Sequence, residues 1–476
     1  MTPPLRFVAV VAALTLCACV DSADGAGNET EAGSSGTSGG TTEPTTVGGT
    51  AGTGSSSETS SGPSETSSSS SSEGSAETGS TTGEAERSAC DRLDAFVVEL
   101  DGEAPAEASA SVDAFVRAMQ YEAHGLPLRC DDRVVFVATE SGSVAGDFND
   151  WDPEALVMEQ PVADAPLWLA EAEIEAPGGL YKFVRNAEFV ADPNARRHGW
   201  DEFGEYSQVD ADPARSHHER WPGFSDAVEP LEPRMVRVFV PAAANGGREL
   251  PVLYMHDGQN VFSPDAFFGG WQASTTADAL ITGGTIRPVL IVAIDNTPAR
   301  LEEYSHVQDD LGDGPIGGLA DDYADFVVEG VMPFVESRYA VQTGPASTAV
   351  LGSSMGGLVS LHLGHRHPDV FGYVGSMSGT LAWGTFGLEN ETMTDRYASG
   401  APAGSVLYVD SGGTGPCPGG GSDNYCDNVV FADVLRGQGW VDEDDLYYRW
   451  VEFAPHNEAA WAQRLPAALT DWFPGA

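Results

Sequence analysis

From about residue 229 to the C-terminus, short apolar runs alternate with longer stretches whose apolar residues recur every three or four positions. Runs that are apolar throughout, such as residues 289–293, fit strands buried on both faces of a parallel sheet, and the longer stretches fit amphipathic helices. The predicted strands cover residues 234–240, 250–255, 288–294, 347–351, 371–377, 405–409 and 446–453, and the predicted helices cover residues 319–338, 355–367, 428–436 and 458–472. We therefore expect residues 227–476 to form an α/β domain, a mostly parallel sheet with helices on both faces.

Residues 131–226 show a different pattern, in which short β-rich runs are separated by Gly, Pro, Asn and Asp. Short strands between such turn residues are typical of a β-sandwich. The preceding segment, residues 89–130, carries an apolar stripe at helical spacing that predicts an amphipathic helix capped by Ser111 or Asp113. The stripe consists of Val112, Phe115, Val116 and Met119.

The sandwich region also carries three motifs in a distinctive order: Val-Ala-Gly-Asp-Phe-Asn-Asp-Trp at 144–151, Leu-Tyr-Lys-Phe at 180–183 and Asp-Pro-Asn-Ala at 192–195. This order resembles the immunoglobulin-like early-set sandwich that precedes glycogen-branching and debranching enzymes and some esterases. The resemblance implies a carbohydrate-binding module, in which Trp151 and Trp200 are candidates for stacking on sugar rings. The alternative is that Trp151 packs in the core and the domain is a scaffold.

The N-terminus predicts export. Arg6 precedes an apolar stretch at 7–16 that is too short for a membrane anchor, as in a signal peptide. The Leu-Cys-Ala-Cys sequence ending at Cys19 resembles a bacterial lipobox, which implies a signal of residues 1–19 and lipidation of Cys19. The alternative is an ordinary secretory peptide. Residues 20–88 are rich in Ser, Thr, Gly and Glu and predict a disordered tether. We expect an exported lipoprotein of the cell envelope, at the outer membrane or cell surface, which contacts the membrane only through its lipid.

The composition narrows the possible partners. The 476 residues include 72 Asp or Glu and only 23 Lys or Arg, for a formal charge of -49, and Lys182 is the single lysine. Binding to nucleic acid or to an anionic membrane surface requires clustered positive charge, so this balance argues against both.

The cysteines fit an exported protein. Four remain beyond the signal, an even number that suggests disulfides in an oxidising compartment. Pairing neighbours gives Cys90 with Cys130 and Cys417 with Cys426, because each pair brackets one local segment. No close Cys-x-x-Cys or His pairing supplies four zinc ligands, so we predict no metal.

The motif with the clearest chemistry is Gly352-x-Ser354-x-Gly356, which lies directly between a predicted strand and a predicted helix. A nucleophile elbow occupies this position in an α/β hydrolase: the serine takes a strained conformation in a tight turn, and small residues two before and two after it avoid clashes. We therefore predict Ser354 as a nucleophile and residues 227–476 as an α/β-hydrolase domain.

A serine hydroxyl needs an imidazole to take its proton, and in this fold the acid and then the histidine follow the serine. His456 is the only histidine after the last predicted strand and is the candidate base. The acid that orients it should follow the strand at 405–409. The candidates are Asp423, which we favour because it lies in the loop that Cys417 and Cys426 would close, then Asp427 and Asp410.

The oxyanion of the reaction needs two backbone donors. The N–H of Met355, the residue after the nucleophile, is one. The loop after the strand at 250–255 reads His-Asp-Gly-Gln-Asn, and there Gly258 permits a tight turn that directs the N–H of Gln259 inward. His256 is expected to brace this loop rather than to act in catalysis.

Several motifs now occur together in order: Leu-Tyr-Met-His-Asp-Gly-Gln-Asn at 253–260, Asp-Asn-Thr-x-x-Arg-x-x-Glu-Tyr at 295–304, Gly-Ser-Ser-Met-Gly-Gly at 352–357, His-Pro-Asp-x-Phe at 367–371 and His-Asn-Glu-x-x-Trp at 456–461. The chain from about 230 to 473 resembles the esterase D-type superfamily, which includes feruloyl and acetyl-xylan esterases, enterochelin esterases, S-formylglutathione hydrolases and mycolyltransferases. The resemblance places Arg300, Glu303 and Tyr304 in a loop near the substrate pocket. Their alternative role is a structural salt bridge.

The sequence thus predicts an exported, lipid-anchored serine esterase that needs no cofactor and hydrolyses a carboxylic ester of a carbohydrate-linked acyl or feruloyl type. The alternatives are an enterochelin-like siderophore trilactone esterase, an acyltransferase of the same fold, and a non-catalytic surface binding protein.

Overall fold

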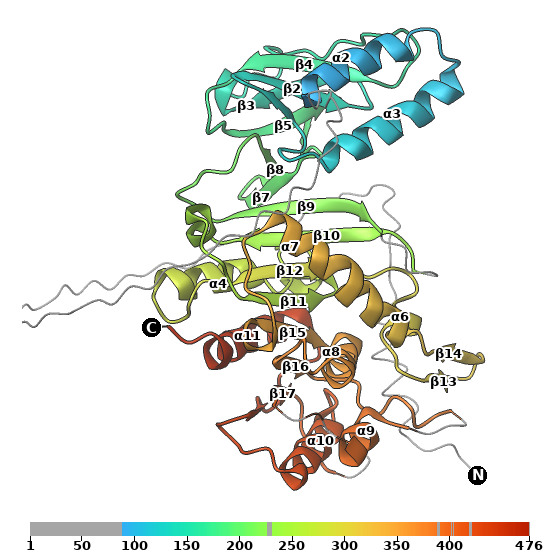
Figure 1. Cartoon of the computed structure of the whole chain (residues 1–476), viewed down its shortest axis with the longest axis vertical. Helices are drawn as coiled ribbons and strands as arrows, with labels where there is room; N and C mark the ends of the chain where they lie inside the picture. Colours follow the sequence, from blue (N-terminus) through green and yellow to red (C-terminus); the bar gives the residue numbers. More distant parts are fainter. Residues whose placement is uncertain are drawn as a thin grey trace, which may run out of the picture. The chain divides into compact units, whose positions relative to one another are not determined.

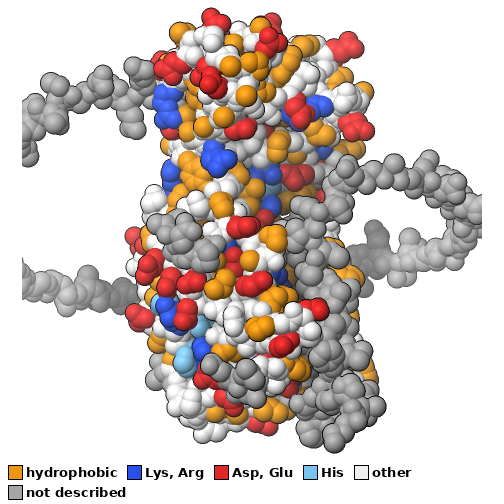
Figure 2. Space-filling view, turned by 90° about the vertical axis from the view of Figure 1, so that its right-hand side faces the viewer, with side chains coloured by type: hydrophobic (Ala, Val, Ile, Leu, Met, Phe, Trp, Pro, Cys, Tyr) orange, Lys and Arg blue, Asp and Glu red, His pale blue; other side chains and the backbone are white. Residues whose placement is uncertain are grey.

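The computed structural model describes residues 88–225, 231–387, 391–400, 402, 404–417 and 421–475 (Figure 1). The predicted signal peptide, its lipidated Cys19 and the tether up to residue 87 lie outside these ranges. Within them, no helix is both long enough and apolar enough to span a bilayer. Acidic side chains are spread over the face that Figure 2 shows, between apolar and uncharged ones.

The C-terminal half is built on a sheet of seven strands in the order β10-β12-β11-β15-β16-β17-β18 (Figure 1). The strands are β10 (Arg234–Val240), β11 (Val252–His256), β12 (Leu290–Ile294), β15 (Thr348–Ser353), β16 (Tyr373–Met377), β17 (Val406–Ser411) and β18 (Leu446–Trp450). All neighbours are parallel except β10 and β12. The carboxyl ends of the six parallel strands, β11, β12, β15, β16, β17 and β18, therefore meet at one edge of the sheet.

Each face of this sheet buries its own apolar core, because successive side chains of a strand point to opposite faces. On β11, Tyr254 belongs to one core and Leu253 and Met255 to the other. Helices α4 (Ala273–Thr282) and α11 (Glu458–Trp472) cover the Met255 side, and Trp461 and Leu465 of α11 are part of that core. On the other side lie α6 (Ala320–Asp325), η5 (Phe326–Val331), α7 (Met332–Arg338), α8 (Met355–Arg366), α9 (Met393–Gly400) and α10 (Tyr425–Gln438).

The sheet continues beyond β10. Strand β9 (His217–Phe224) pairs antiparallel with β10 along its length and also with β7, so the 13-stranded sheet runs on through β7, β8, β5 and β3, with β6 paired to β5. These strands are β3 (Ser143–Gly146), β5 (Leu180–Arg185), β6 (Glu188–Val190), β7 (Arg197–Asp201) and β8 (Gly204–Gln208). The boundary predicted at 226/227 thus falls between two neighbouring strands of one sheet.

The N-terminal part of the described chain has three layers. Sheet β1 (Leu128–Cys130), β2 (Arg133–Ala138) and β4 (Trp168–Glu173) shares a core with β3 and β5, in which Phe136 packs on Tyr181. The other face of this sheet is covered by α2 (Ala89–Leu100) and α3 (Pro105–Gln120). The predicted stripe lies on α3; α2, which Ser88 caps, was not predicted. Two packed β-layers are present, while the early-set identity of the region stays a prediction.

The remaining elements are short. They are η1 (Asp147–Asn149), η2 (Ala242–Gly246), η3 (Gly258–Asn260), η4 (Phe267–Gly269), α5 (Arg300–Glu303), β13 (Gln308–Asp310), β14 (Pro315–Gly317) and η6 (Pro345–Ser347). Both predicted disulfides, Cys90–Cys130 and Cys417–Cys426, are present.

The two tryptophans singled out for sugar stacking differ in their surroundings. Trp151 is half-buried, donates through Nε1 to Asp147 over 2.9 Å and contacts the ring of Phe189. Trp200 packs against the α11-side core and between the rings of His198 and His218. Trp200 is thus engaged in packing within the continuous sheet.

Candidate active site

Ser354 lies in the tight turn between β15 and α8. Its backbone has φ 56° and ψ -121°, an arrangement that costs free energy in a residue with a Cβ and persists only where the surroundings enforce it. The space around the turn explains the glycines: a Cβ on Gly352 would collide with the Gly356 carbonyl, and one on Gly356 would lie 3.2 Å from the Asp257 carboxylate. The serine itself is 3 % exposed.

Among the described residues, the hydroxyl of Ser354 has one hydrogen-bond partner, the Oγ1 of Thr380 at 3.2 Å. The backbone is fixed on both sides, because Ser354 N donates to Met377 O over 3.0 Å and Thr380 N donates to Ser354 O over 3.1 Å. The end of β16 and the residues after it therefore hold the turn in place.

His456 lies just before α11, whose N-cap is the neighbouring Asn457. The imidazole Nδ1 is 2.6 Å from Oδ1 of Asp423, and the Trp461 ring meets the imidazole edge-on at 5.0 Å. Nε2 of His456 is buried and has no hydrogen-bond partner among the described residues. A hydrogen-bonded Nδ1 leaves Nε2 as the nitrogen available to a reacting group.

The second oxygen of Asp423 accepts from several donors. Ser378 Oγ donates to it over 2.7 Å, the N–H of Gly412 also donates to it, and Arg464 Nη1 is 3.5 Å away. Burial would raise the pKa of Asp423, but the hydrogen bonds from His456 and Ser378 and the Arg464 charge outweigh it and lower that pKa below its usual value. The carboxylate is therefore held ionised against the imidazole.

A short chain of contacts connects the histidine to the serine. Ser378, which bonds to Asp423, directly follows Met377, whose carbonyl accepts from Ser354 N. The structure thus brings Ser354, Asp423 and His456 together at the carboxyl ends of β15 to β17. The Ser354 hydroxyl bonds to Thr380 rather than to the imidazole; without substrate, hydrogen bonds of catalytic groups are often long and tighten only in the complex.

The other two candidate acids are placed differently. Asp410, the residue before the last of β17, is fully buried, with its carboxylate 3.4 Å from Nε of Arg464 and 3.4 Å from the donating Tyr408 hydroxyl. Burial, opposed by Arg464, raises the pKa of Asp410 to about 7. Asp427 lies in the first turn of α10. The acid that bonds to His456 is Asp423.

The two predicted oxyanion donors lie at the ends of neighbouring parallel strands, β11 and β15. Met355 is the first residue of α8, and the first N–H groups of a helix lack intrahelical acceptors. Gln259 lies in η3, after a turn in which a Cβ on Gly258 would be 2.6 Å from the Asp295 carboxylate. As predicted, His256 braces this region: its Nδ1 is 2.9 Å from the Tyr323 hydroxyl, and burial lowers its pKa to about 4.

The ion pair between Asp257 and Arg300, next to the η3 turn, was not predicted from the sequence. Asp257, with φ 57°, accepts from Nε and Nη2 of Arg300 at 2.7 and 2.8 Å and from Asn296 Nδ2. Burial would raise the pKa of Asp257, but the Arg300 charge and hydrogen bonds lower it. Glu458 lies close to this turn, because Asn260 donates to its carboxylate over 3.3 Å. Burial raises the pKa of Glu458, and the negative charge of Asp257 raises it further.

Glu303 and Tyr304, which the resemblance placed near the pocket, are buried. Glu303 forms a two-bond ion pair with Arg234, at 2.7 and 2.9 Å, in which both side chains are 1 % exposed. The Tyr304 hydroxyl accepts from Asp257 N over 3.3 Å. The ion pairs of Arg300 with Asp257 and of Glu303 with Arg234 match the structural alternative.

A strained serine at the carboxyl edge of a mostly parallel sheet, with an acid–histidine pair beside it, defines an α/β-hydrolase-like domain. The chain belongs to the Esterase family, described as "Putative esterase", which matches residues 229–472, just over half of its length.

Two curated relatives are similar over part of the chain. One is the "Uncharacterized protein YbbA" of Bacillus subtilis, 25% identical over 179 residues, which are 36% of this chain and 64% of the relative. The other is "Diacylglycerol acyltransferase/mycolyltransferase Ag85A" of Mycobacterium leprae, 32% identical over 137 residues, 29% of this chain and 38% of the relative. The chain thus spans less than two thirds of either relative.

Solved structures of similar fold include the enterobactin esterase FES from Shigella flexneri, with a TM-score of 0.41, 18% identity and coverage of 72% of this chain and 94% of that one. A ferulic acid esterase aligns with a TM-score of 0.43, 20% identity and coverage of 54% and 98%.

Proposed function

We propose that the chain is a serine esterase working through an acyl-enzyme, with Ser354 as nucleophile, His456 as base and Asp423 as the residue that orients the imidazole. The observation that carries this proposal is the 2.6 Å contact between His456 Nδ1 and Asp423 Oδ1 beside a strained serine. The contact fixes the proton on Nδ1, so Nε2 can accept the serine proton, and the ionised carboxylate stabilises the imidazolium that forms.

In the proposed reaction, Ser354 Oγ attacks the ester carbonyl as Nε2 of His456 takes the hydroxyl proton. The N–H groups of Gln259 and Met355 donate to the oxyanion of the tetrahedral intermediate. His456 then returns the proton to the leaving alcohol, and the acyl group stays on Ser354. Water, deprotonated by the same imidazole, attacks the acyl-enzyme and releases the acid. The Asp257–Arg300 pair stabilises the turn that presents Gln259.

The substrate proposed is an ester of a carbohydrate-linked acyl or feruloyl type, supported by the β-layered region that precedes the catalytic domain and by the predicted export signal. Lipid attachment at Cys19 and residence in the cell envelope are part of the proposal. Growth with radiolabelled palmitate should label the full chain, and Cys19→Ala should remove that label.

The experiment that tests the chemistry is a panel of acetyl, feruloyl and catecholate esters, given to the wild type and to Ser354→Ala. Loss of about 10^3-fold or more in kcat/KM is expected for Ser354→Ala. The neighbouring Ser353→Ala is the matched control and should keep most of the activity, since Ser353, the last residue of β15, has no role in the proposed reaction. Equal hydrolysis by the wild type and Ser354→Ala would rule out the proposed mechanism. Selectivity within the panel decides between a feruloyl or carbohydrate ester and a siderophore trilactone.

An acyltransferase is the second candidate function, favoured by the 32% identity to the mycobacterial acyltransferase over 137 residues. A transferase passes the acyl group from Ser354 to an alcohol rather than to water. Adding a sugar acceptor to the assay would then produce acylated sugar in excess over free acid, whereas a hydrolase would produce free acid at an unchanged rate.

A further inference from the structure

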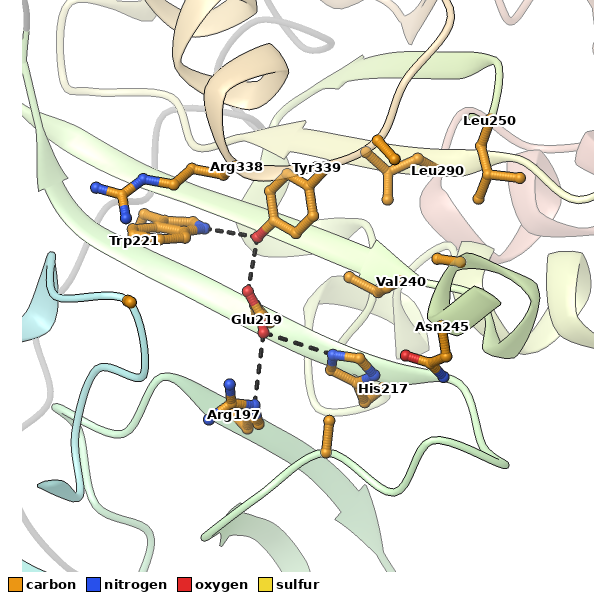
Figure 3. Close-up of a pocket in the computed structure, with 14 residues that line it drawn as sticks. Arg197, His217, Glu219, Trp221, Val240, Asn245, Leu250, Leu290, Arg338 and Tyr339 are labelled. Atoms are coloured by element: carbon orange, nitrogen blue, oxygen red, sulfur yellow. Dashed lines mark hydrogen bonds and ion pairs between the residues drawn. The ribbon is translucent and has the colours of Figure 1, made fainter. Parts of the chain in front are cut away.

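A pocket of about 320 Å³ opens between β9 and the C-terminal end of α7 (Figure 3). Leu250 and Leu290 line it, and these residues lie at the amino ends of β11 and β12. Ser354 instead follows the carboxyl end of β15, which runs parallel to β11. A strand of five residues spans about 17 Å, so the pocket and the proposed catalytic group lie at opposite edges of the sheet.

The polar wall of the pocket is built around one carboxylate, that of Glu219 on β9. Tyr339 donates to it over 2.7 Å, and Arg197 Nε and His217 Nε2 each lie 3.5 Å from it (Figure 3). Burial would raise the pKa of Glu219, but the His217 hydrogen bond and the arginine charges lower it to about 2. Glu219 is therefore ionised and already engaged by its neighbours.

The positive charge around the pocket exceeds what Glu219 can balance. The Arg338 guanidinium lies 5.1 Å from the ring centre of Trp221, which lines the pocket, and that of Arg196 lies 3.0 Å from it. Arg196 is 2 % exposed, and none of its three guanidinium nitrogens has a hydrogen-bond partner within the described ranges. Burial lowers the pKa of Arg196 to about 10, so it remains cationic at neutral pH.

Arg197 and Arg338 line the pocket together with the single carboxylate of Glu219, and Arg196, which packs on the Trp221 ring, adds a third positive charge beside it. This excess occurs in a chain with 72 acidic residues and only 23 Lys or Arg, where a neighbouring acid would be the usual partner. A buried guanidinium that makes no hydrogen bond within the described ranges is unfavourable, and an anion entering the neighbouring pocket would add to the negative charge that Glu219 supplies. Val240, Leu250 and Leu290 supply an apolar wall opposite the charges.

We propose that this pocket is a second ligand site, which takes a small organic carboxylate with a compact apolar body. The carboxylate would lie toward Arg197 and Arg338, and its apolar part would pack on Trp221 and the aliphatic wall. This site is independent of the proposed esterase mechanism, because none of its residues contacts Ser354, Asp423 or His456 in the described contacts.

The test uses the full chain with benzoate as probe and benzamide as its uncharged counterpart. Calorimetry should give a Kd for benzoate of about 1 mM or below, and binding of benzamide should be at least about tenfold weaker. Crystals soaked with 4-bromobenzoate should show anomalous bromine signal beside Trp221. A bromine found only near Ser354, or equal binding of benzoate and benzamide, would overturn the proposal.

Two variants address the pocket itself. Arg197→Met should weaken benzoate binding by about 10- to 100-fold, as expected for loss of a charge-assisted hydrogen bond. Ala340→Trp fills the pocket from an exposed position, so it should abolish binding while thermal unfolding stays cooperative. Arg366→Met, a change at a half-exposed arginine of α8, is the control and should bind as the wild type does. Unchanged benzoate affinity in a folded Ala340→Trp protein contradicts the site, whatever the fate of Arg197→Met.

Discussion

The Nδ1 of His456 lies 2.6 Å from Oδ1 of Asp423, although 33 positions of the chain separate the two residues. They come from different loops: Asp423 precedes α10 in a segment that the Cys417–Cys426 disulfide closes, and His456 precedes α11. Because the pair forms without substrate, the imidazole is oriented in advance, and its orientation depends on the course of the Asp423 loop.

Replacing Asp423 with Asn should lower kcat by about 10^3- to 10^4-fold with little change in KM, because the neutral amide no longer stabilises the imidazolium or selects its tautomer. Asp427→Asn, a change four residues along the same segment, should stay within a few-fold of the wild type. Steady-state kinetics on any ester that the protein hydrolyses measures both. A large kcat loss in Asp427→Asn with an active Asp423→Asn would mean that the acid has been misassigned.

The two disulfides should separate stability from activity. In the chain-entropy picture, the 9-residue span of Cys417–Cys426 contributes about 3 kcal/mol and the 40-residue span of Cys90–Cys130 about 4 kcal/mol. The double Ala variant of Cys417 and Cys426 should nevertheless lose more kcat, about tenfold, because its loop carries Asp423. The Cys90 and Cys130 double variant should lose more thermal stability and keep its kcat at a temperature where it is folded. Equal kcat values for the two variants would contradict this view.

The buried pair of Arg234 and Glu303 predicts a stability effect far from the reacting atoms. Arg234→Met should lower the free energy of unfolding by about 3–5 kcal/mol, since it leaves the Glu303 carboxylate buried without its partner. Arg366→Met, whose partners Asp321 and Asp325 are partly exposed, should cost at most about 1 kcal/mol. Denaturant titration measures both. Adding Glu303→Leu to Arg234→Met should recover part of the loss, and no recovery would count against the desolvation argument.

Asp410 should make the protein less stable as the pH rises. Its pKa in the folded chain, about 7, lies above the usual 3.8, so the folded state holds the proton more tightly than the unfolded state does. The free energy of unfolding should therefore fall between about pH 4 and pH 7, by up to about 4 kcal/mol. Asp410→Asn removes this fall, so the variant should be more stable than the wild type at pH 8 and similar at pH 4. A variant less stable than the wild type at pH 8 would show that the Arg464 contact dominates.

Much of the catalytic half could be predicted because its signals are local. Residues 234–240 and 458–472 are observed as β10 and α11 with the limits predicted. A buried strand and an amphipathic helix each show a hydrophobic pattern within one continuous stretch of sequence, so both can be recognised from that stretch alone. The sharp turn at Ser354 could be predicted for the same reason, because its motif lies within a few consecutive residues. The predicted helix at 319–338 is instead divided by the π-helical turn η5, and α9, which is short and polar, was missed.

What could not be predicted depends on residues that only folding brings together. Asp257 and Arg300 are 43 positions apart, and no spacing rule pairs them. The choice among Asp423, Asp427 and Asp410 was left open for the same reason, because all three follow the same predicted strand and only the loop's path decides which meets His456. Strand β9 carries mixed polar and apolar residues on a sheet shared by two regions, so its place beside β10 was not evident from its own sequence.

The position of β9 has a consequence for dissecting the protein. If the chain were cut at residue 227, to isolate what looks like a free-standing enzyme, β10 would lose the neighbour that satisfies one side of its backbone. An open, apolar strand edge invites pairing with other chains and therefore aggregation. A shortened protein that retains His217–Phe224 would still lack β7, but it would keep the hydrogen bonds between β9 and β10. A truncated protein intended to stay soluble should therefore begin before residue 217.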